Sequence, residues 1–382
     1  MKIALIGYEA NIKNRVGSNQ YAFELMKALY ELDQKNQYTI LLPTPPLPDL
    51  PPARKNWQYK IVGPRKFWNF CGLPLALFRQ KPQPEVVFNP GHYCPLFFPS
   101  PLVVSIMDLG YLRHPEHFTS KIYWKLKIWT ALSMKRAKHL LTISQSTKND
   151  IINYYQIDSK KITVAYPGYD KNKFKIQKAK GKIEEVKKKY KIKGDYILFL
   201  STLKPSKNIE GLLAAYKILI AKKASETGMS QYPHVQLVIA GKKGWLFAKI
   251  FAKVKALGLK NKVIFTDFVE EEEVPLLMSG AKVFVLPSFW EGFGIPVVEA
   301  MACGTPVVVS KVGSLPEIVG DMGVIVDPYD PNDIARGISE VLHYDTAQYH
   351  SQMTKGIERA KKFSWEECAR KTIKVLEKVG EI

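Results

Sequence analysis

Residues Pro287–Pro306, PSFWEGFGIPVVEAMACGTP, join a strand end, a glycine loop and a helix start in one short stretch. The apolar run 281–286 before it predicts a buried strand. Pro296 suits the first turn of a helix, which should end at Gly304, and the β-branched run 306–310 predicts another strand. This order places free backbone N–H groups at a helix start, where they attract phosphate.

Two glutamates, Glu291 and Glu299, lie before and within that helix. Glu291 should stand beside whatever is attached to a bound phosphate. Glu299 lies about one turn into the helix, where its carboxylate can accept two hydrogen bonds from ribose hydroxyls. An acid near bound phosphates is electrostatically costly, so hydroxyl recognition explains both positions better than chance. The plain alternative is a surface loop followed by a helix with a solvated glutamate.

Together with residues 313–317 (GSLPE) and 323–328 (GVIVDP), this stretch resembles glycosyltransferase family 4, the retaining enzymes that use nucleotide sugars. The signature of that family is a glutamate, seven residues and a second glutamate, which this sequence keeps. The resemblance extends over nearly the whole chain. It implies an α/β protein of GT-B fold, with two Rossmann-like domains facing each other across a cleft. It also implies that neither a metal nor another cofactor is required.

The length of 382 residues and the hydrophobic content of 46% suit two α/β domains. We expect an N-terminal, acceptor-binding domain over residues 1–175 and a lysine-rich linker over 176–194. The nucleotide-sugar-binding domain should cover 195–362. In relatives, a C-terminal helix, here 363–382, crosses back onto the first domain.

The formal net charge of +21 predicts an anionic partner: nucleic acid, an acidic membrane leaflet or an anionic substrate. Residues 63–81 and the expected helix 116–139 both mix basic residues with aromatic and aliphatic ones. Docking against an anionic bilayer is one interpretation, and core packing with snorkelling basic ends is the other. Apolar runs fall short of the roughly 18 residues of a membrane helix. No nucleic-acid-reading motif occurs, so a membrane surface is the expected partner.

Cysteine and histidine spacing argues for a cytoplasmic protein without a metal centre. The four cysteines show no paired spacing, which suits a reducing compartment. His114 and His117 do not form the His-Glu-x-x-His arrangement. No Asp-x-Asp occurs, which argues against the metal-dependent GT-A type. We therefore expect a cytoplasmic protein, peripheral on the inner face of the plasma membrane.

The resemblance also implies roles for individual residues. Gly17 matches a glycine loop beside the donor diphosphate and the acceptor, although a plain β–α turn explains it equally well. Lys207 matches the lysine that holds the diphosphate, whereas Thr202 and Ser206 stand where relatives carry arginines. The implied donor-binding residues are Gly17, Thr202, Lys207, Glu291, Phe293, Gly294, Ile295 and Glu299, and the implied catalytic residues are Glu291, Asp108 and Lys207.

One position departs from the family pattern. Relatives carry His-Asp after the strand 102–106, with the histidine facing the donor sugar, but this chain has Met107 before Asp108. A thioether cannot donate a hydrogen bond to a sugar hydroxyl. Either His92 or His114 replaces the histidine, or the contact is dispensable, or the sugar specificity has shifted.

The expected reaction is the transfer of a hexose to a hydroxyl group with retention of configuration. The donor would be GDP-mannose or, second, UDP-glucose. The acceptor would be a lipid-linked or polysaccharide chain of cell-envelope glycan synthesis. A sugar-nucleotide epimerase of the same fold and a basic nucleic-acid-binding protein are the alternatives.

Overall fold

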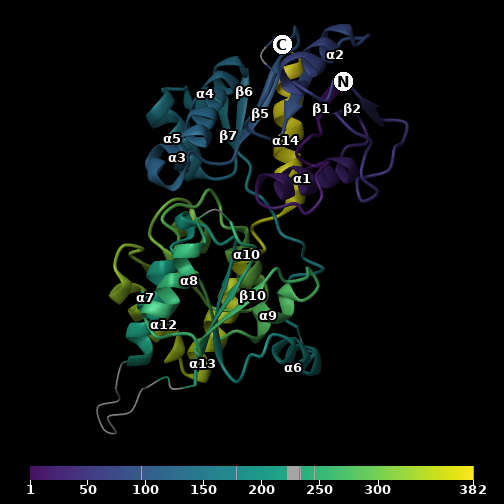
Figure 1. Ribbon diagram of the computed structural model, residues 1–382. Coiled ribbons are helices and arrows are strands. Elements are labelled where there is room, and N and C mark those ends of the chain that lie inside the picture. Colours follow the sequence, from purple (N-terminus) through teal and green to yellow (C-terminus); the bar gives the residue numbers. More distant parts are fainter. Residues whose placement is uncertain (96, 178, 222–231, 233, 245, 382) are drawn as a thin grey trace. The chain divides into compact units, whose positions relative to one another are not determined.

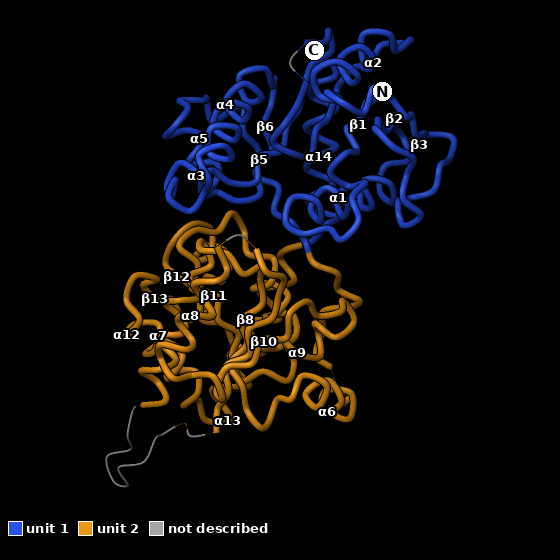
Figure 2. The backbone as a smooth tube through the Cα atoms, viewed as in Figure 1, with its two compact units in different colours: residues 1–168, 364–382 blue, residues 169–363 orange. Residues whose placement is uncertain are grey.

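The computed structural model describes residues 1–95, 97–177, 179–221, 232, 234–244 and 246–381. They form two compact units, residues 1–168 with 364–382 and residues 169–363 (Figure 2). Each unit contains one all-parallel sheet. Helical connections link most of the consecutive strands, as in Rossmann-like domains, whereas the described residues between β2 and β3 and between β4 and β5 form loops.

Unit 1 has the strand order β3-β2-β1-β4-β5-β6-β7, so the order reverses between β1 and β4. Short β-branched and apolar runs form these strands, and the central ones are almost wholly buried because helices cover both faces. The strands are β1 (Lys2–Ile6), β2 (Gln37–Leu42), β3 (Trp57–Ile61), β4 (Val86–Asn89), β5 (Leu102–Ile106), β6 (His139–Thr142) and β7 (Ile162–Val164).

The last helix of the chain, α14, belongs to unit 1. It packs against α1 and against β4, β5 and β6, which Figure 1 shows as a yellow helix beside purple and blue elements. Ser364 caps it by accepting a hydrogen bond from the Glu367 N–H at 3.1 Å. The helical elements of the unit are α1 (Ser18–Leu32), the π-helix η1 (Trp68–Gly72), α2 (Leu73–Arg79), α3 (Gly110–Arg113), η2 (Pro115–His117), α4 (Ser120–Arg136), α5 (Gln145–Tyr155), η3 (Ser159–Lys161) and α14 (Trp365–Gly380).

Unit 2 repeats the same plan with the order β10-β9-β8-β11-β12-β13, which reverses between β8 and β11. Its strands are β8 (Tyr196–Leu200), β9 (Gln236–Ala240), β10 (Val263–Asp267), β11 (Val283–Leu286), β12 (Val307–Ser310) and β13 (Gly323–Val326). Its helical elements are α6 (Lys180–Lys189), η4 (Pro205–Lys207), α7 (Ile209–Ala221), α8 (Ala248–Ala256), α9 (Val274–Gly280), α10 (Ile295–Ala302), α11 (Leu315–Val319), η5 (Gly320–Met322), α12 (Pro331–Leu342) and α13 (Thr346–Ala360). Across the described ranges of both units, no helix combines the length and hydropathy needed to cross a bilayer.

The structure divides the chain at other residues than those expected from sequence. Unit 2 begins at Tyr169, and the segment 176–194, expected to be a linker, lies within it. There α6 packs on α9, and Lys189 and the Tyr190 hydroxyl both contact the Glu273 carboxylate at 2.6 Å. The expected helix 116–139 is also shorter, because a separate 3-10 turn, η2, precedes α4. Lysine content alone was a poor guide to a linker.

Gly168 lies at the end of unit 1, directly against the start of α14. A Cβ atom added there would stand 2.1 Å from the Trp365 nitrogen and 2.5 Å from the Ser364 carbonyl carbon. Both atoms are backbone, so the chain must move apart to admit a methyl group. Gly181, in the first turn of α6, has nothing within 4 Å of an added Cβ.

We predict that Gly168→Ala lowers the free energy of unfolding by about 1–3 kcal/mol, because the added methyl overpacks a backbone crossing. Gly181→Ala should leave it unchanged or slightly raised, because alanine favours a helix. Urea unfolding followed by circular dichroism measures both. Equal stability of the two variants would show that the crossing at Gly168 is not tight.

Candidate functional site

The carboxyl ends of β8 and β11 lie side by side at the centre of the unit 2 sheet, where the strand order reverses. Ligands of open parallel sheets bind at such a reversal, because the loops that follow the two strands diverge there. The loop after β8 covers residues 201–208 and the loop after β11 covers 287–294. The Phe289 N–H donates to the Ser206 carbonyl at 2.9 Å, so the two loops are joined. Most of the residues expected to bind the donor lie on these loops.

The start of α10 has the geometry that the sequence predicted. Gly294 is its N-cap, with a φ of 94°, and no side chain in the described part of the chain caps it. Gly294 is buried, whereas Ile295, Pro296 and Glu299 are half-buried. The N–H groups of such a start favour an anion. Glu299 follows in the second turn.

Lys207 and Glu291 form an ion pair beside that helix start. Lys207 ends the 3-10 turn η4 after β8, and Glu291 precedes α10 after β11. Their side chains are only 10% and 13% exposed, so water screens the pair weakly. The structure therefore brings together a cation, a carboxylate and a helix start that no side chain of the described residues caps. That combination suits a ligand that carries both phosphate and hydroxyl groups.

Residues after β12 fix the glycine loop in place. Ser314 donates its hydroxyl to the carbonyl oxygens of Glu291 at 3.1 Å and Phe293 at 3.0 Å, and its N–H also reaches the Glu291 carbonyl. A Cβ added at Gly313 would stand 2.5 Å from that same carbonyl oxygen. Residues 313–317 are part of the family resemblance, and the structure shows that Gly313 and Ser314 contact the Glu291 loop. The sequence feature that could have predicted this contact is Gly313, a glycine just before a helix start.

Asn208 fixes the loop that carries Lys207. Its φ is 54°, its side-chain amide donates to the Pro328 carbonyl at 2.6 Å, and its Oδ1 accepts from the Gly211 N–H at 3.2 Å. Pro328 thus links the Lys207 loop to the loop after β13. Asn208 is therefore a positioning residue, and no local pattern in the sequence predicted this role, because its partner Pro328 lies 120 residues away.

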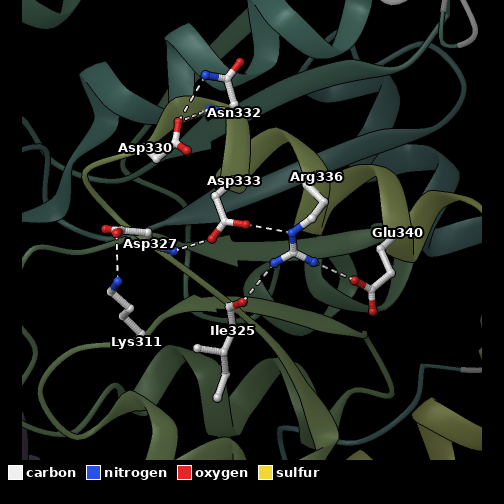
Figure 3. A network of polar contacts seen from close by, with 8 residues as sticks. All are labelled: Lys311, Ile325, Asp327, Asp330, Asn332, Asp333, Arg336 and Glu340. Carbon is white, nitrogen blue, oxygen red and sulfur yellow. Dashed lines mark hydrogen bonds and ion pairs between the residues drawn. The ribbon is translucent and has the colours of Figure 1, made fainter.

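A polar network holds that third loop to the start of α12 (Figure 3). Asp333 accepts from the Asp327 N–H at 2.6 Å and pairs with Arg336, which also contacts Glu340. The hydrogen bond from Lys311, at 2.7 Å, lowers the pKa of the Asp327 carboxyl. These contacts are close to solvent, so their role is to fix the loop geometry more than to add stability.

Two other expected donor residues lie in unit 2. Thr202 is half-buried in the loop after β8. The next residue, Leu203, donates its N–H to the Lys242 carbonyl and accepts from the Gly244 N–H. The Phe293 side chain is buried, with its ring 5.5 Å from that of Phe363. Phe293 can therefore serve a ligand only through its backbone.

Unit 1 carries the remaining expected residues, at the carboxyl ends of β1 and β5. Gly17 is exposed, has a φ of 56° and is the N-cap of α1. Asp108 is half-buried and accepts a hydrogen bond from the Gly110 N–H at 2.8 Å, at the start of α3. Met107 is buried, and its carbonyl accepts from the Thr147 hydroxyl at 3.0 Å. The Asp108 carboxylate thus stabilises the start of α3 by accepting this hydrogen bond.

His92 and His114, the two candidates to replace the family histidine, have different surroundings. His114 contacts Glu116 at 3.1 Å and stacks on His117. His92 follows β4 on a loop that Asn89 fixes by donating to the Gly91 and Tyr93 carbonyls. The buried Nδ1 of His92 has no hydrogen-bond partner among the described residues. Burial lowers the pKa of His92, although the nearby Asp108 charge opposes this, so the imidazole is neutral.

His114, Glu116 and His117 also form the set of possible metal ligands in the described residues, with ligand atoms all within 4.8 Å of one another. They lie on and beside the turn η2 of unit 1. The Glu116 side chain is 61% exposed and already contacts both imidazoles. Three adjacent ligands could hold a cation, but they belong to unit 1, and none lies on the unit 2 loops that carry Lys207 and Glu291.

Known proteins resemble the chain over both units. The model of Glycosyltransferase Family 4 matches residues 16–173, and the model of Glycosyl transferases group 1 matches residues 182–363. O-antigen chain mannosyltransferase B of Escherichia coli is 36% identical over 272 residues, which are 71% of this chain and 68% of that protein. O-antigen chain mannosyltransferase RfbU of Salmonella typhimurium is 31% identical over 62% of this chain and 60% of its own. The serotype-specific mannosyltransferase WbdA of Escherichia coli is 32% identical, and the match spans only 28% of its length.

Solved structures match nearly the whole chain. The sucrose-phosphate synthase of Thermosynechococcus elongatus has a TM-score of 0.76 at 20% identity, over 99% of both chains. Anabaena HepE, solved with UDP and glucose, has a TM-score of 0.74 at 19% identity, also over 99% of both. At such identities the likeness concerns the fold. With the two Rossmann-like sheets, it confirms the predicted GT-B class.

We predict that Gly313→Ala reduces both stability and any activity that depends on Glu291. The methyl group would displace the Glu291 carbonyl, and a positive φ costs alanine roughly 1 kcal/mol besides. Gly258→Ala is the matched control, because its φ is 68° and nothing lies within 4 Å of an added Cβ. Thermal unfolding and ligand binding of both variants separate the two effects. Equal losses in the two would mean that Gly313 supplies only backbone freedom.

We predict that the pKa of His92 in the folded protein lies below its ordinary value of 6.5, because burial disfavours the charged imidazole. Below pH 6.5 the His92 imidazole then binds a proton more readily in the unfolded chain than in the folded one. The free energy of unfolding therefore falls as the pH drops below 6.5. His92→Asn should weaken this dependence, leaving the part due to His139, whose pKa burial also lowers. Nuclear magnetic resonance titration of the imidazoles measures the pKa directly. The resonance that is absent from His92→Asn identifies His92. A pKa of about 6.5 for that resonance in the wild type would contradict the prediction.

Proposed function

Because the chain belongs to glycosyltransferase family 4, we propose that it transfers a hexose from a nucleotide diphosphate sugar to a hydroxyl group with retention of configuration. The observation that carries this proposal is the Lys207–Glu291 ion pair beside the uncapped start of α10. A diphosphate sugar has anionic and hydroxyl groups next to each other, and this site offers partners for both. A phosphate ion alone would leave the carboxylates without a purpose.

The residues of unit 2 divide the donor among them in this proposal. Lys207 and the backbone N–H groups of Gly294 and Ile295 receive the diphosphate. Glu299, half-buried in the second turn of α10, accepts hydrogen bonds from the ribose hydroxyls. Glu291 accepts hydrogen bonds from the sugar hydroxyls. When the diphosphate binds, Lys207 is shared between its oxygens and the Glu291 carboxylate.

The chemical step needs no covalent intermediate with the protein. The bond between the anomeric carbon and the diphosphate oxygen breaks, and the acceptor oxygen forms its bond to that carbon on the same face. The acceptor proton passes to the leaving diphosphate. Lys207 and the amides of α10 stabilise the negative charge that develops on the leaving group, and the site holds the acceptor oxygen and the leaving oxygen on the same face of the sugar. This step requires no metal.

Mannose is the proposed sugar, because the curated relatives described above are named mannosyltransferases. GDP-mannose is the first donor to test and UDP-glucose the second. The acceptor class is a lipid-linked or polysaccharide chain, as the names of the O-antigen relatives suggest. The described cysteines are all free thiols, which fits the cytoplasm.

We predict that one nucleoside diphosphate, GDP first, raises the melting temperature of the protein by mass action. Glu299→Ala should weaken its binding roughly tenfold to a hundredfold, because the ribose loses a charged acceptor. Glu291→Gln should bind it as tightly as wild type or more tightly, since Lys207 no longer faces a carboxylate, yet transfer from GDP-mannose should fall about a hundredfold. Thermal shift and product formation, each with and without a chelator, measure these effects.

Wild-type protein that no nucleotide stabilises would overturn the donor assignment. Unchanged transfer in both variants would remove Glu291 and Glu299 from the site. Loss of transfer on chelation would contradict the metal-independent step. Glu185→Gln, at an exposed position on α6 of unit 2, is the charge-matched control and should change neither reading.

A further inference from the structure

Two segments of unit 1 expose large apolar side chains. In residues 65–81, which contain η1 and α2, the side chains of Phe67, Phe70 and Phe78 are 64%, 58% and 53% exposed. On α4, Trp124 and Ile128 are 54% and 52% exposed. Leu75, Ile122 and Leu132 add smaller contributions. Large side chains so exposed and so closely grouped indicate an interaction surface.

The two segments form one surface rather than two. The ring of Phe70 meets that of Trp129 on α4 edge to face, with centroids 4.8 Å apart. Their inner sides also share one core, which contains Trp68, Leu73, Leu77 and Met134. The Trp68 indole N–H donates to the Val62 carbonyl at 2.9 Å and fixes η1 on that core. We name residues 65–81 and 121–138 the basic aromatic surface.

Helical spacing separates the inner from the outer side of each segment. On α4, Trp124, Ile128 and Leu132 recur every four residues and all face outward, whereas Thr130, Ser133 and Met134 are buried. Helix α4 buries small polar residues and exposes a tryptophan, so packing against the core does not account for its outer side. The core interpretation of these segments therefore explains only one side of each.

The charge of the basic aromatic surface is of one sign. Residues 65–81 contain four basic residues and residues 121–138 contain six, and neither segment contains an aspartate or glutamate. Several cations lie next to the aromatic rings: the Lys127 ammonium is 5.0 Å from the Trp124 ring centroid and that of Lys125 is 4.8 Å from the ring of Tyr93. Apolar side chains among cations match the acyl boundary and the headgroups of an anionic bilayer.

We propose that the basic aromatic surface docks on an anionic glycerophospholipid membrane. A second copy of the chain would have to bring ten cations against ten, which like-charge repulsion opposes. Nucleic acid would attract the cations but would leave Ile122, Ile128 and Leu132 without an apolar partner. The inference goes beyond the proposed transfer and does not depend on it, because vesicle binding requires neither donor nor acceptor.

Co-sedimentation of the full chain with vesicles tests the proposal. Vesicles that contain phosphatidylglycerol should bind the wild type, vesicles of phosphatidylcholine alone should bind it much less, and added salt should weaken binding. Lys66→Gln/Lys121→Gln/Lys125→Gln should lower the partition coefficient about fivefold for each charge removed. Phe78→Ser/Trp124→Ser should lower it about tenfold or more.

Lys249→Gln/Lys255→Gln/Lys260→Gln is the charge-matched control, because these exposed lysines belong to unit 2. It should bind vesicles almost as the wild type does. Circular dichroism and melting temperature establish that each variant is folded, and the salt dependence of the wild type tests the proposal even where a variant is not.

Three outcomes would overturn the membrane assignment. The first is the absence of wild-type binding to phosphatidylglycerol vesicles, and the second is equal binding by all the variants. The third is a wild type that dimerises through this surface, or binds an oligonucleotide, while it ignores vesicles. Each of these can occur with nucleotide binding intact, so a failure here is distinct from a failure of the proposed transfer.

Discussion

An ion pair between residues from two neighbouring strand ends, Lys207 after β8 and Glu291 after β11, is the interaction on which the site in unit 2 depends. Both side chains are largely shielded from water, so each charge is stabilised mainly by the other and by what enters beside them. The free N–H groups at the start of α10 add positive potential without adding a side chain. A ligand must therefore offer oxygen anions to the lysine and the amides and hydroxyl donors to the glutamate. A nucleotide sugar is one class of ligand that carries both close together.

Backbone constraints keep that ion pair in place. Gly294 turns into α10 with a positive φ, and Gly313 passes so close to Glu291 that no larger residue fits. Ser314 and Asn208 then tie the two loops to the strands beyond them through hydrogen bonds to carbonyl oxygens. Because these contacts involve the main chain, the charged side chains arrive in position before any ligand does. Such preorganisation is what electrostatic stabilisation of a leaving group requires.

Part of the net charge of +21 is concentrated on one region of unit 1. The basic aromatic surface gathers ten cations on two segments of unit 1 whose inner sides complete its core. The same helices thus contribute to the core and expose the apolar side chains to which we assign membrane docking. The diphosphate site that we propose in unit 2 uses little of this charge, because it relies on Lys207 and a helix start. In these two proposals, positive charge comes from many side chains in unit 1 and from one lysine with backbone N–H groups in unit 2.

The residue pattern by itself determined the class of the fold and the centre of the site. Apolar runs bounded by glycine and proline located β1, β4, β5 and β8, and the stretch from Pro287 located α10, because local preferences act within a few residues of chain. Sequence could not show that Ser314 and Asn208 hold the site, since their partners come from other loops, nor that segment 176–194 packs into unit 2. It left His92 and His114 equal, and only folding gave the second a carboxylate partner and the first a buried, unpaired nitrogen. Contacts between distant segments depend on how strands are ordered in the sheet, and that order exists only once the chain has folded.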